Sequence, residues 1–205
     1  MGQILIFLWL AGVILRIWRL ARFFQLEGYD SRRYIRWLFS KITRILMWRA
    51  LIFISVALLV AVLLGFFGQD SPALYLVIWG TAAVLSALPE PTKEVKQKFS
   101  LTQRAIRLLI TAFALALIVM VGVVVIIETT ADASQRIEFA LVSFLGVIIY
   151  HLAPFILPLA NVVNFPMEAG FRRMFRERAR RTLKKAGPVV IGITGSYGKT
   201  STKEY

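Results

Sequence analysis

The sequence predicts a mostly α-helical, polytopic membrane protein with four or five spans and basic interfacial helices. It ends in the first strand and the phosphate loop of a truncated α/β nucleotide-binding domain. Three observations carry this prediction. The 205-residue chain is 58% hydrophobic with a mean hydropathy of +0.70, which is more apolar than soluble globular domains are. Its positive charges gather beside long apolar segments, and a short β-branched run followed by glycines and a lysine closes the sequence.

Four stretches are long and apolar enough to cross a bilayer, whose hydrocarbon core of about 30 Å takes roughly 20 helical residues. They are residues 50–67, 72–88, 108–127 and 139–159. A fifth stretch, 4–17, is shorter. It either spans, with Arg16 and Arg19 reaching to the interface, or lies on the membrane surface. No positively charged side chain precedes it and no small-residue cleavage site follows it, which argues against a cleaved signal peptide.

The positive charges predict an orientation in the membrane. Of the 25 Lys and Arg residues, 22 lie in the segments 16–49, 93–107 and 172–185, whereas 68–71 and 128–136 together hold one. Since loops rich in Lys and Arg stay on the cytoplasmic side, the alternation predicts a multi-pass protein with a cytoplasmic C-terminus.

The same pattern predicts what the chain binds through its charges. The net charge is +14 at pH 7, and the Lys and Arg residues that produce it lie beside apolar segments. We therefore expect a lipid bilayer with anionic lipids at the cytoplasmic face as the partner, and no nucleic acid. The chain has no cysteine, which excludes disulfides, thiolate zinc sites and a cysteine nucleophile.

Two polar segments read as basic amphipathic helices that lie at the membrane interface. The first follows Gly28, which breaks the preceding segment, and Asp30 or Ser31, which caps a helix. Its arginines alternatively clamp the phosphates of a nucleotide sugar or a lipid diphosphate. Its apolar stripe is Tyr34, Leu38, Ile42 and Leu46, and its basic residues are Arg32, Arg33, Arg36, Lys41 and Arg44. The second helix, Met167–Ala186, carries Phe171, Phe175, Ala179 and Leu183 at a spacing of four.

One face of the last span carries His151, Pro154, Pro158 and Asn161 at helical spacing. An ionisable side chain inside a bilayer is a candidate functional residue. Prolines also free backbone carbonyls that neighbouring helices satisfy, so the same face reads as a kinked packing seam. We favour the packing seam and keep His151 as a candidate contact for a lipid substrate.

The C-terminal residues resemble a phosphate-binding loop. Pro188 to Thr194 form a β-branched run typical of a buried strand, and the glycines that follow allow close approach to a ligand. A helix that begins near Lys199 would point its N–H groups at a phosphate. The general G-x-x-x-x-G-K-[ST] pattern fails by one position, because Ile193 stands where its first glycine is required.

The segment G-I-T-G-S-Y-G-K-T-S-T, residues 192–202, resembles the ATP loop of the Mur ligase family. That loop typically reads G-[IV]-T-G-[ST]-x-G-K-[ST]-[ST]. Tyr197 stands where asparagine is commonest in the family. A tyrosine at this position resembles a membrane-anchored subgroup related to the UDP-N-acetylmuramoyl-tripeptide D-alanyl-D-alanine ligase. The match covers about 14 of the 205 residues, with weaker support from LEGYDSRRYIRWL upstream.

The resemblance implies a role for each matching residue. Lys199 would contact the β- and γ-phosphates of ATP and stabilise the transition-state charge, and Thr200 would reach Mg²⁺. The backbone from Gly195 to Thr200 would cradle the phosphates, and Ser201 would contact a phosphate or belong to the first helical turn. The residues implied in cofactor binding are Thr194, Gly195, Ser196, Tyr197, Gly198, Lys199, Thr200 and Ser201.

The family's chemistry is the joining of a carboxylate to an amine through an acyl phosphate made from ATP. On this basis we expect a transmembrane region at 1–165, a basic linker helix at 166–187 and the start of an ATP-binding domain at 188–205. We expect a fragment of a bacterial plasma-membrane ligase for peptidoglycan precursors, inactive by itself, with a lipid-linked or UDP-linked substrate. The alternatives are a poly-γ-glutamate or capsule-type ligase, and a non-enzymatic transporter or scaffold with a regulatory nucleotide loop.

Overall fold

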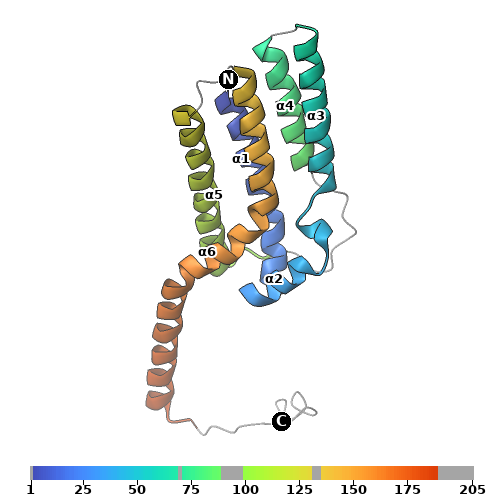
Figure 1. Cartoon of the computed structure of the whole chain (residues 1–205). Helices are drawn as coiled ribbons and strands as arrows, with labels where there is room; N and C mark the ends of the chain where they lie inside the picture. Colours follow the sequence, from blue (N-terminus) through green and yellow to red (C-terminus); the bar gives the residue numbers. More distant parts are fainter. Residues whose placement is uncertain (1, 69–70, 89–98, 131–134, 189–205) are drawn as a thin grey trace. The chain divides into compact units, whose positions relative to one another are not determined.

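The computed structural model describes residues 2–68, 71–88, 99–130 and 135–188 (Figure 1). This part of the chain is built from six α-helices and one short 3₁₀ helix, η1. The elements are α1 (Gly2–Leu26), α2 (Ser31–Phe39), η1 (Ile42–Arg44), α3 (Trp48–Phe66), α4 (Pro72–Ala87), α5 (Gln103–Thr130) and α6 (Gln135–Ala186).

The predicted fold class is wrong in its α/β part, which was expected at residues 188–205. The described residues are helical with connecting turns, and they contain no strand and no α/β nucleotide-binding domain. Of the run predicted as a strand, 189–194 lie outside the described residues. An α/β domain needs neighbouring strands and helices on both faces of its sheet, and a short β-branched run does not by itself establish one.

The chain divides into two compact units, Met1–Asn164 and Phe165–Tyr205. In the first unit, α1, α4 and the first part of α6 run in one direction, and α3 and α5 run in the other (Figure 1). The second unit contains the remainder of α6, whose basic side chains and whose Phe171, Phe175 and Leu183 are all exposed. The predicted linker helix and the last predicted span thus belong to one continuous helix of 52 residues.

Four helices are long and apolar enough to cross a membrane, in agreement with a multi-pass membrane protein. They are Gln3–Leu26, Trp48–Phe66, Gln103–Ile127 and Ile137–Ala186. The set differs from the predicted one in two places. The segment that starts at Ile4 continues past Arg16 as a helix, whereas α4 has only 16 residues and is about 24 Å long at 1.5 Å per residue.

The outer faces of these helices are apolar and exposed. Ile52 and Leu59 of α3 are 57% and 60% exposed, and Ile110 and Ile118 of α5 are 63% and 66% exposed. Soluble proteins rarely expose contiguous apolar surface on this scale, and hydrocarbon is the solvent that suits it.

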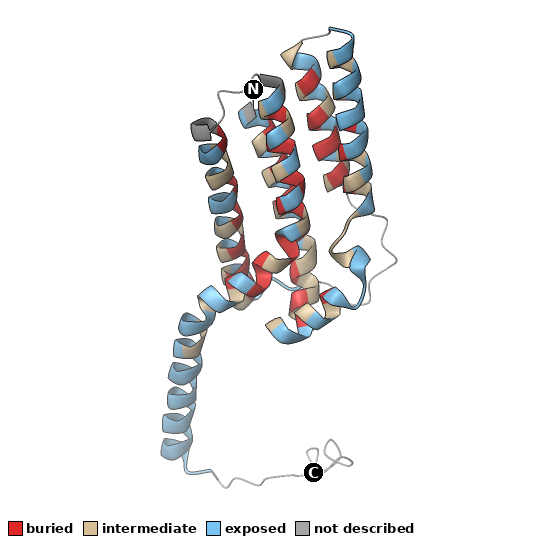
Figure 2. Cartoon of the chain, in the orientation of Figure 1, coloured by how far each residue is buried: buried red, intermediate tan, exposed pale blue. Residues whose placement is uncertain are grey.

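Helix α1 is the centre of the first unit. It packs against α2, α4 and α5, and its Trp9 meets Tyr150 of α6 edge to face at 6.3 Å. Figure 2 shows the buried residues on the inward faces of the helices. The buried residues of α1 recur every three or four positions: Leu5, Trp9, Val13, Ile17, Ala21 and Phe24, none more than 2% exposed. This continuous stripe shows that the segment belongs to the helical core and not to a surface helix.

Two glycines allow α1 to approach its neighbours closely. A Cβ atom on Gly146 of α6 would lie 2.5 Å from Cγ of the buried Trp9 ring. A Cβ atom on Gly12 would lie 3.2 Å from the Cβ of Ala87 in α4. Small residues at such crossings let helices pack backbone to backbone, which provides much of the association energy inside a membrane.

The turn from α1 to α2 is fixed by local chemistry. Gly28, with φ of +68°, donates its N–H to the carbonyl of Gln25 at 2.9 Å, and Tyr29 donates to that of Phe24 at 3.0 Å. This pattern is a Schellman motif, which favours glycine in the left-handed position. Asp30 then caps α2 by accepting from the N–H groups of Arg32 and Arg33, as predicted. These two hydrogen bonds lower the pKa of the Asp30 carboxyl below its usual value, and the bond from Arg33 has the larger effect.

Helix α2 is shorter than the predicted amphipathic helix. Tyr34 and Leu38 are fully buried, but Ile42 is 56% exposed, because the helix ends at Phe39 and Lys41 is extended. The Ser40 hydroxyl donates to the carbonyl of Trp37 at 2.8 Å, and the Arg44 guanidinium donates to the same carbonyl. These side chains satisfy carbonyl groups that the end of a helix leaves free.

Arg16 joins three parts of the first unit. It is 4% exposed and donates to the carbonyls of Tyr150 at 2.6 Å, Arg44 at 3.0 Å and Ile45 at 2.7 Å. In a helix the Tyr150 carbonyl would accept from the N–H of the fourth residue on, which is Pro154 and has none. Arg16 therefore satisfies a carbonyl that a proline frees, and it also binds two carbonyls of the basic connection before α3.

The close approach at Gly146 predicts that alanine destabilises the protein more at this position than at a glycine without close neighbours. Gly146→Ala should lower the free energy of unfolding by about 1–3 kcal/mol, because the Trp9 ring cannot move away without displacing the core. The measurement is unfolding in mixed micelles with increasing SDS, followed by tryptophan fluorescence. Gly122→Ala in α5 is the matched control, since its Cβ atom meets nothing within 4 Å. Equal effects of the two substitutions would contradict the assigned contact.

The link between Arg16 and Pro154 predicts non-additive substitutions. Arg16→Met should destabilise the protein by at least about 2 kcal/mol, because it leaves buried carbonyls without a donor. In a Pro154→Ala background the restored helical N–H takes over the Tyr150 carbonyl, so the cost of Arg16→Met should fall by about 1 kcal/mol. The same SDS titration measures all four proteins. Strict additivity would show that the proline is not the reason for the Arg16 contact.

Candidate functional site: an arginine-lined cavity

The residues predicted to bind ATP and Mg²⁺, from Thr194 to Ser201, all lie outside the described residues. Those predictions, including the role of Lys199 and the Mg²⁺ contact of Thr200, therefore stay predictions. In the described residues, no group of three or more His, Cys, Asp or Glu side chains is placed to hold a metal ion.

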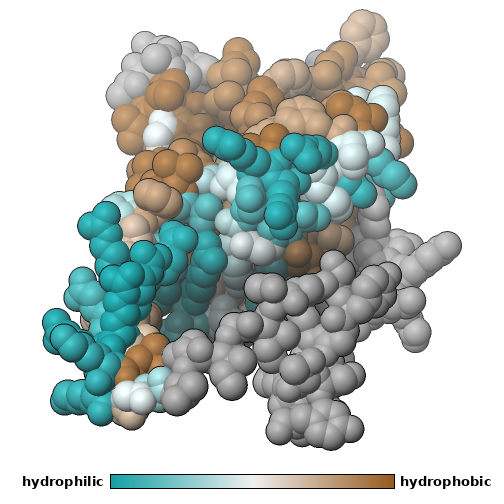
Figure 3. Space-filling view, turned by 90° about the horizontal axis from the view of Figure 1, so that it is seen from below, coloured by the Kyte–Doolittle hydropathy of each residue, from teal (hydrophilic) through white to brown (hydrophobic). Residues whose placement is uncertain are grey.

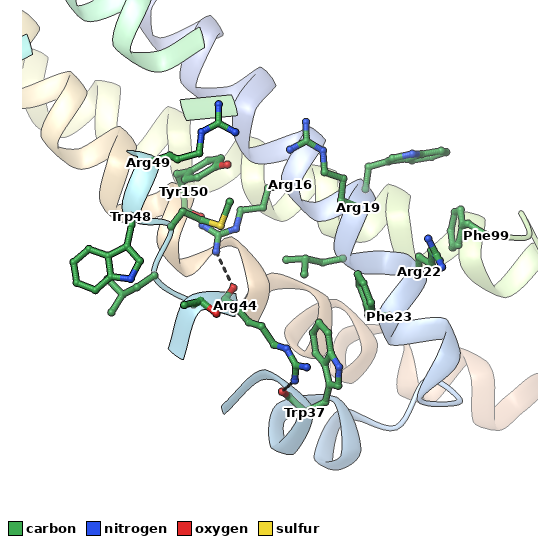
Figure 4. A pocket seen from close by; sticks show the side chains of 15 residues that line it. Arg16, Arg19, Arg22, Phe23, Trp37, Arg44, Trp48, Arg49, Phe99 and Tyr150 are labelled. Atoms are coloured by element: carbon green, nitrogen blue, oxygen red, sulfur yellow. Dashed lines mark hydrogen bonds between the residues drawn. The ribbon is translucent and has the colours of Figure 1, made fainter. Parts of the chain in front are cut away.

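The first unit contains a cavity of about 780 Å³ near the basic end of its helices (Figure 4). Five arginines and six aromatic residues line it, and no acidic side chain is among the described residues of its wall. The arginines are Arg16, Arg19, Arg22, Arg44 and Arg49, and the aromatic residues are Trp18, Phe23, Trp37, Trp48, Phe99 and Tyr150. In the view of Figure 3, the hydrophilic and the apolar side chains gather in separate patches of the surface.

Two of the arginines are held by the end of α4. Arg19 donates to the carbonyl of Ala87 at 2.8 Å, and Arg49 lies 3.4 Å from that of Leu85. The last carbonyls of a helix have no partner inside the helix and carry its negative dipole end. These contacts hold both guanidinium groups at the cavity wall, but they use only part of the five N–H donors of each.

Arg44 and Trp37 form the side of the cavity nearest α2. The Arg44 guanidinium lies over the Trp37 ring at 4.1 Å, and its Nη1 donates to Ser40 at 2.5 Å. Trp37 stacks in turn on Phe23, with ring centroids 4.6 Å apart. This stack connects α1 to α2 and positions Arg44, which also supplies one of the carbonyls that Arg16 binds.

Arg22 differs from the other four arginines. Its Nε and Nη2 atoms are buried and have no hydrogen-bond partner among the described residues. Its guanidinium carbon lies 5.7 Å from the centre of the Phe23 ring. Nε and Nη2 form one edge of the planar guanidinium group, and Arg22 is one of the residues that line the cavity.

The cavity wall also contains apolar side chains. Trp18 and Phe99 meet edge to face with ring centroids 5.5 Å apart, and Trp18 and Trp48 are 42% and 60% exposed. Tryptophan is typical of membrane interfaces, where one side of the ring is apolar and the other is wet. The cavity thus combines cationic and apolar surfaces.

The face predicted around His151 behaves mainly as a packing seam. Pro154 and Pro158 are buried, and the Asn161 amide donates to the Ser31 hydroxyl at 3.1 Å, which fastens α6 to the start of α2. His151 Nδ1 lies 2.7 Å from the carbonyl of Val147 one turn earlier. His151 is not part of the cavity wall.

The predicted phosphate clamp and the cavity have only one arginine in common. Arg32, Arg33, Arg36 and Lys41 are exposed and do not line the cavity, and only Arg44 does. The sequence carried a signal for the others, because Arg16, Arg19 and Arg22 are spaced by three and share one side of α1. The prediction treated these three arginines as the charges at the end of a short span. It therefore did not place them against the other helices.

Comparisons of the chain with protein-family models, curated proteins and solved structures found no match. The function of the chain is therefore inferred from its own residues.

Proposed function

We propose that the chain anchors an ATP-dependent carboxylate–amine ligase in a bacterial plasma membrane and supplies its phosphate-binding loop. The observation that carries the proposal is the segment G-I-T-G-S-Y-G-K-T-S-T at residues 192–202. In this proposal Lys199 contacts the β- and γ-phosphates of ATP, Thr200 reaches Mg²⁺, and the product is an amide in a cell-wall precursor.

Two features of the described residues support this assignment. Four helices are long and apolar enough to cross a membrane, which gives the chain the means to hold an enzyme at a bilayer. The sequence from Arg172 to Lys185 is strongly basic and helical, and such helices lie against anionic headgroups. ATP is a cytoplasmic substrate, so the proposal requires the basic segments to face the cytoplasm.

The assignment of Lys199 is tested in the protein encoded by the full open reading frame. Lys199→Ala should lower kcat for ATP-dependent amide formation by about 10²-fold or more, because it removes a cation from the transferring phosphoryl group. Phosphate release with D-alanyl-D-alanine and a UDP-linked muramoyl peptide provides the readout. Lys203→Ala is the matched control and should leave kcat near that of wild type. An unchanged kcat in Lys199→Ala would overturn the assignment.

The orientation is tested with single cysteines, since the chain has none of its own. Ser71→Cys lies between α3 and α4, and Lys41→Cys lies in the basic connection before α3. In intact cells a membrane-impermeant maleimide should label Ser71→Cys, and it should label Lys41→Cys only after permeabilisation. Labelling of Lys41→Cys in intact cells would place the basic residues outside and exclude a cytoplasmic loop.

A further inference from the structure

We propose that the arginine-lined cavity binds the phosphate group of a membrane amphiphile, with the phosphate on Arg22 and the apolar chain along Trp18 and Phe99. The inference does not depend on the proposed ligase activity, because it is argued only from the described residues that line the cavity. The ligand class follows from the charge of the wall, the geometry of Arg22 and the apolar side of the cavity.

The charge of the wall calls for an anion. Five guanidinium groups line one cavity, and none of its described wall residues is acidic. Four of these groups donate to backbone carbonyls, which supply dipoles but no net negative charge. Like charges at this density repel one another more strongly beside a low-dielectric membrane than in water, and a bound anion relieves that repulsion.

Arg22 provides the geometry that a phosphate needs. Its buried Nε and Nη2 form the edge that donates two parallel hydrogen bonds to two oxygens of one phosphate or carboxylate. A buried donor without an acceptor is unfavourable, so a ligand that supplies two oxygens at this edge stabilises the folded protein. Arg19 and Arg49, held at the end of α4, add positive charge to the same cavity.

The apolar part of the cavity indicates that the phosphate is carried by an amphiphile. Trp18, Trp48 and Phe99 line the cavity together with the arginines, and Trp18 and Trp48 remain partly exposed. In Figure 4, Phe99 lies beside Arg22, whereas Trp48 lies at the opposite end of the cavity. The volume of about 780 Å³ far exceeds that of a phosphate group and lies within the usual range of small-molecule sites. A lipid phosphate reaching the cavity from the bilayer would occupy both surfaces.

The test uses the 205-residue chain purified in a neutral detergent, with bound lipids counted by native mass spectrometry. Phosphatidic acid should be retained. Phosphatidylcholine with the same acyl chains should not be retained, because its choline cation neutralises the charge of the headgroup. Arg22→Gln should weaken phosphatidic acid binding by about tenfold or more, because both donors of the bidentate edge are lost. Arg22→Lys, which keeps the charge without the planar edge, should give an intermediate affinity.

Arg36→Gln is the matched control, because Arg36 is an exposed arginine of α2 outside the cavity; it should bind phosphatidic acid like wild type. If Arg22→Gln and Arg36→Gln weaken phosphatidic acid binding equally, or if both lipids are retained equally, the proposal is overturned. Either result would show that the protein attracts lipids only through its general positive charge. Displacement by millimolar inorganic phosphate or ATP would also overturn it, by showing a site for soluble phosphates. If Arg22→Gln fails to fold, Arg22→Lys and the two-lipid comparison in wild type decide the matter in the same way.

Discussion

The first unit depends on one buried cation. Arg16 lies in the middle of α1 and binds carbonyls of α6, of the last residue of η1 and of the residue that follows it. A single side chain therefore joins segments more than 100 residues apart. Inside a bilayer an unsatisfied backbone group is costly, and Pro154 creates such a group at Tyr150. The proline in α6 and the arginine in α1 are therefore two halves of one constraint, and each explains the presence of the other.

This constraint organises the neighbouring contacts. Tyr150 also donates its hydroxyl to the carbonyl of Ser86 at 2.9 Å and carries the Arg16 guanidinium 4.7 Å from its ring centre. Gly146, one turn earlier, lets Trp9 approach the α6 backbone. The arginines around this centre line a cavity in which cationic and aromatic side chains lie next to one another.

Much of the helical region could be predicted from sequence, because long apolar runs and turn residues are local signals. Gly28 and Asp30 marked the end of one helix and the start of the next. The role of Arg16 could not be predicted, because it depends on a proline 138 positions away. The same limit applies to the cavity, since the spacing of Arg16, Arg19 and Arg22 defines a helix face but not the neighbours that it meets. The α/β prediction failed because a short β-branched run does not specify sheet neighbours.

The short length of α4 has a consequence for the bilayer itself. A helix of 16 residues is about 6 Å shorter than a typical hydrocarbon core, and a bilayer responds to such a mismatch by thinning locally. The end of α4 is where Arg19 and Arg49 bind its last carbonyls, so polar groups replace hydrocarbon at that depth. A bilayer around the protein would therefore be thinner beside α4 than beside the longer helices.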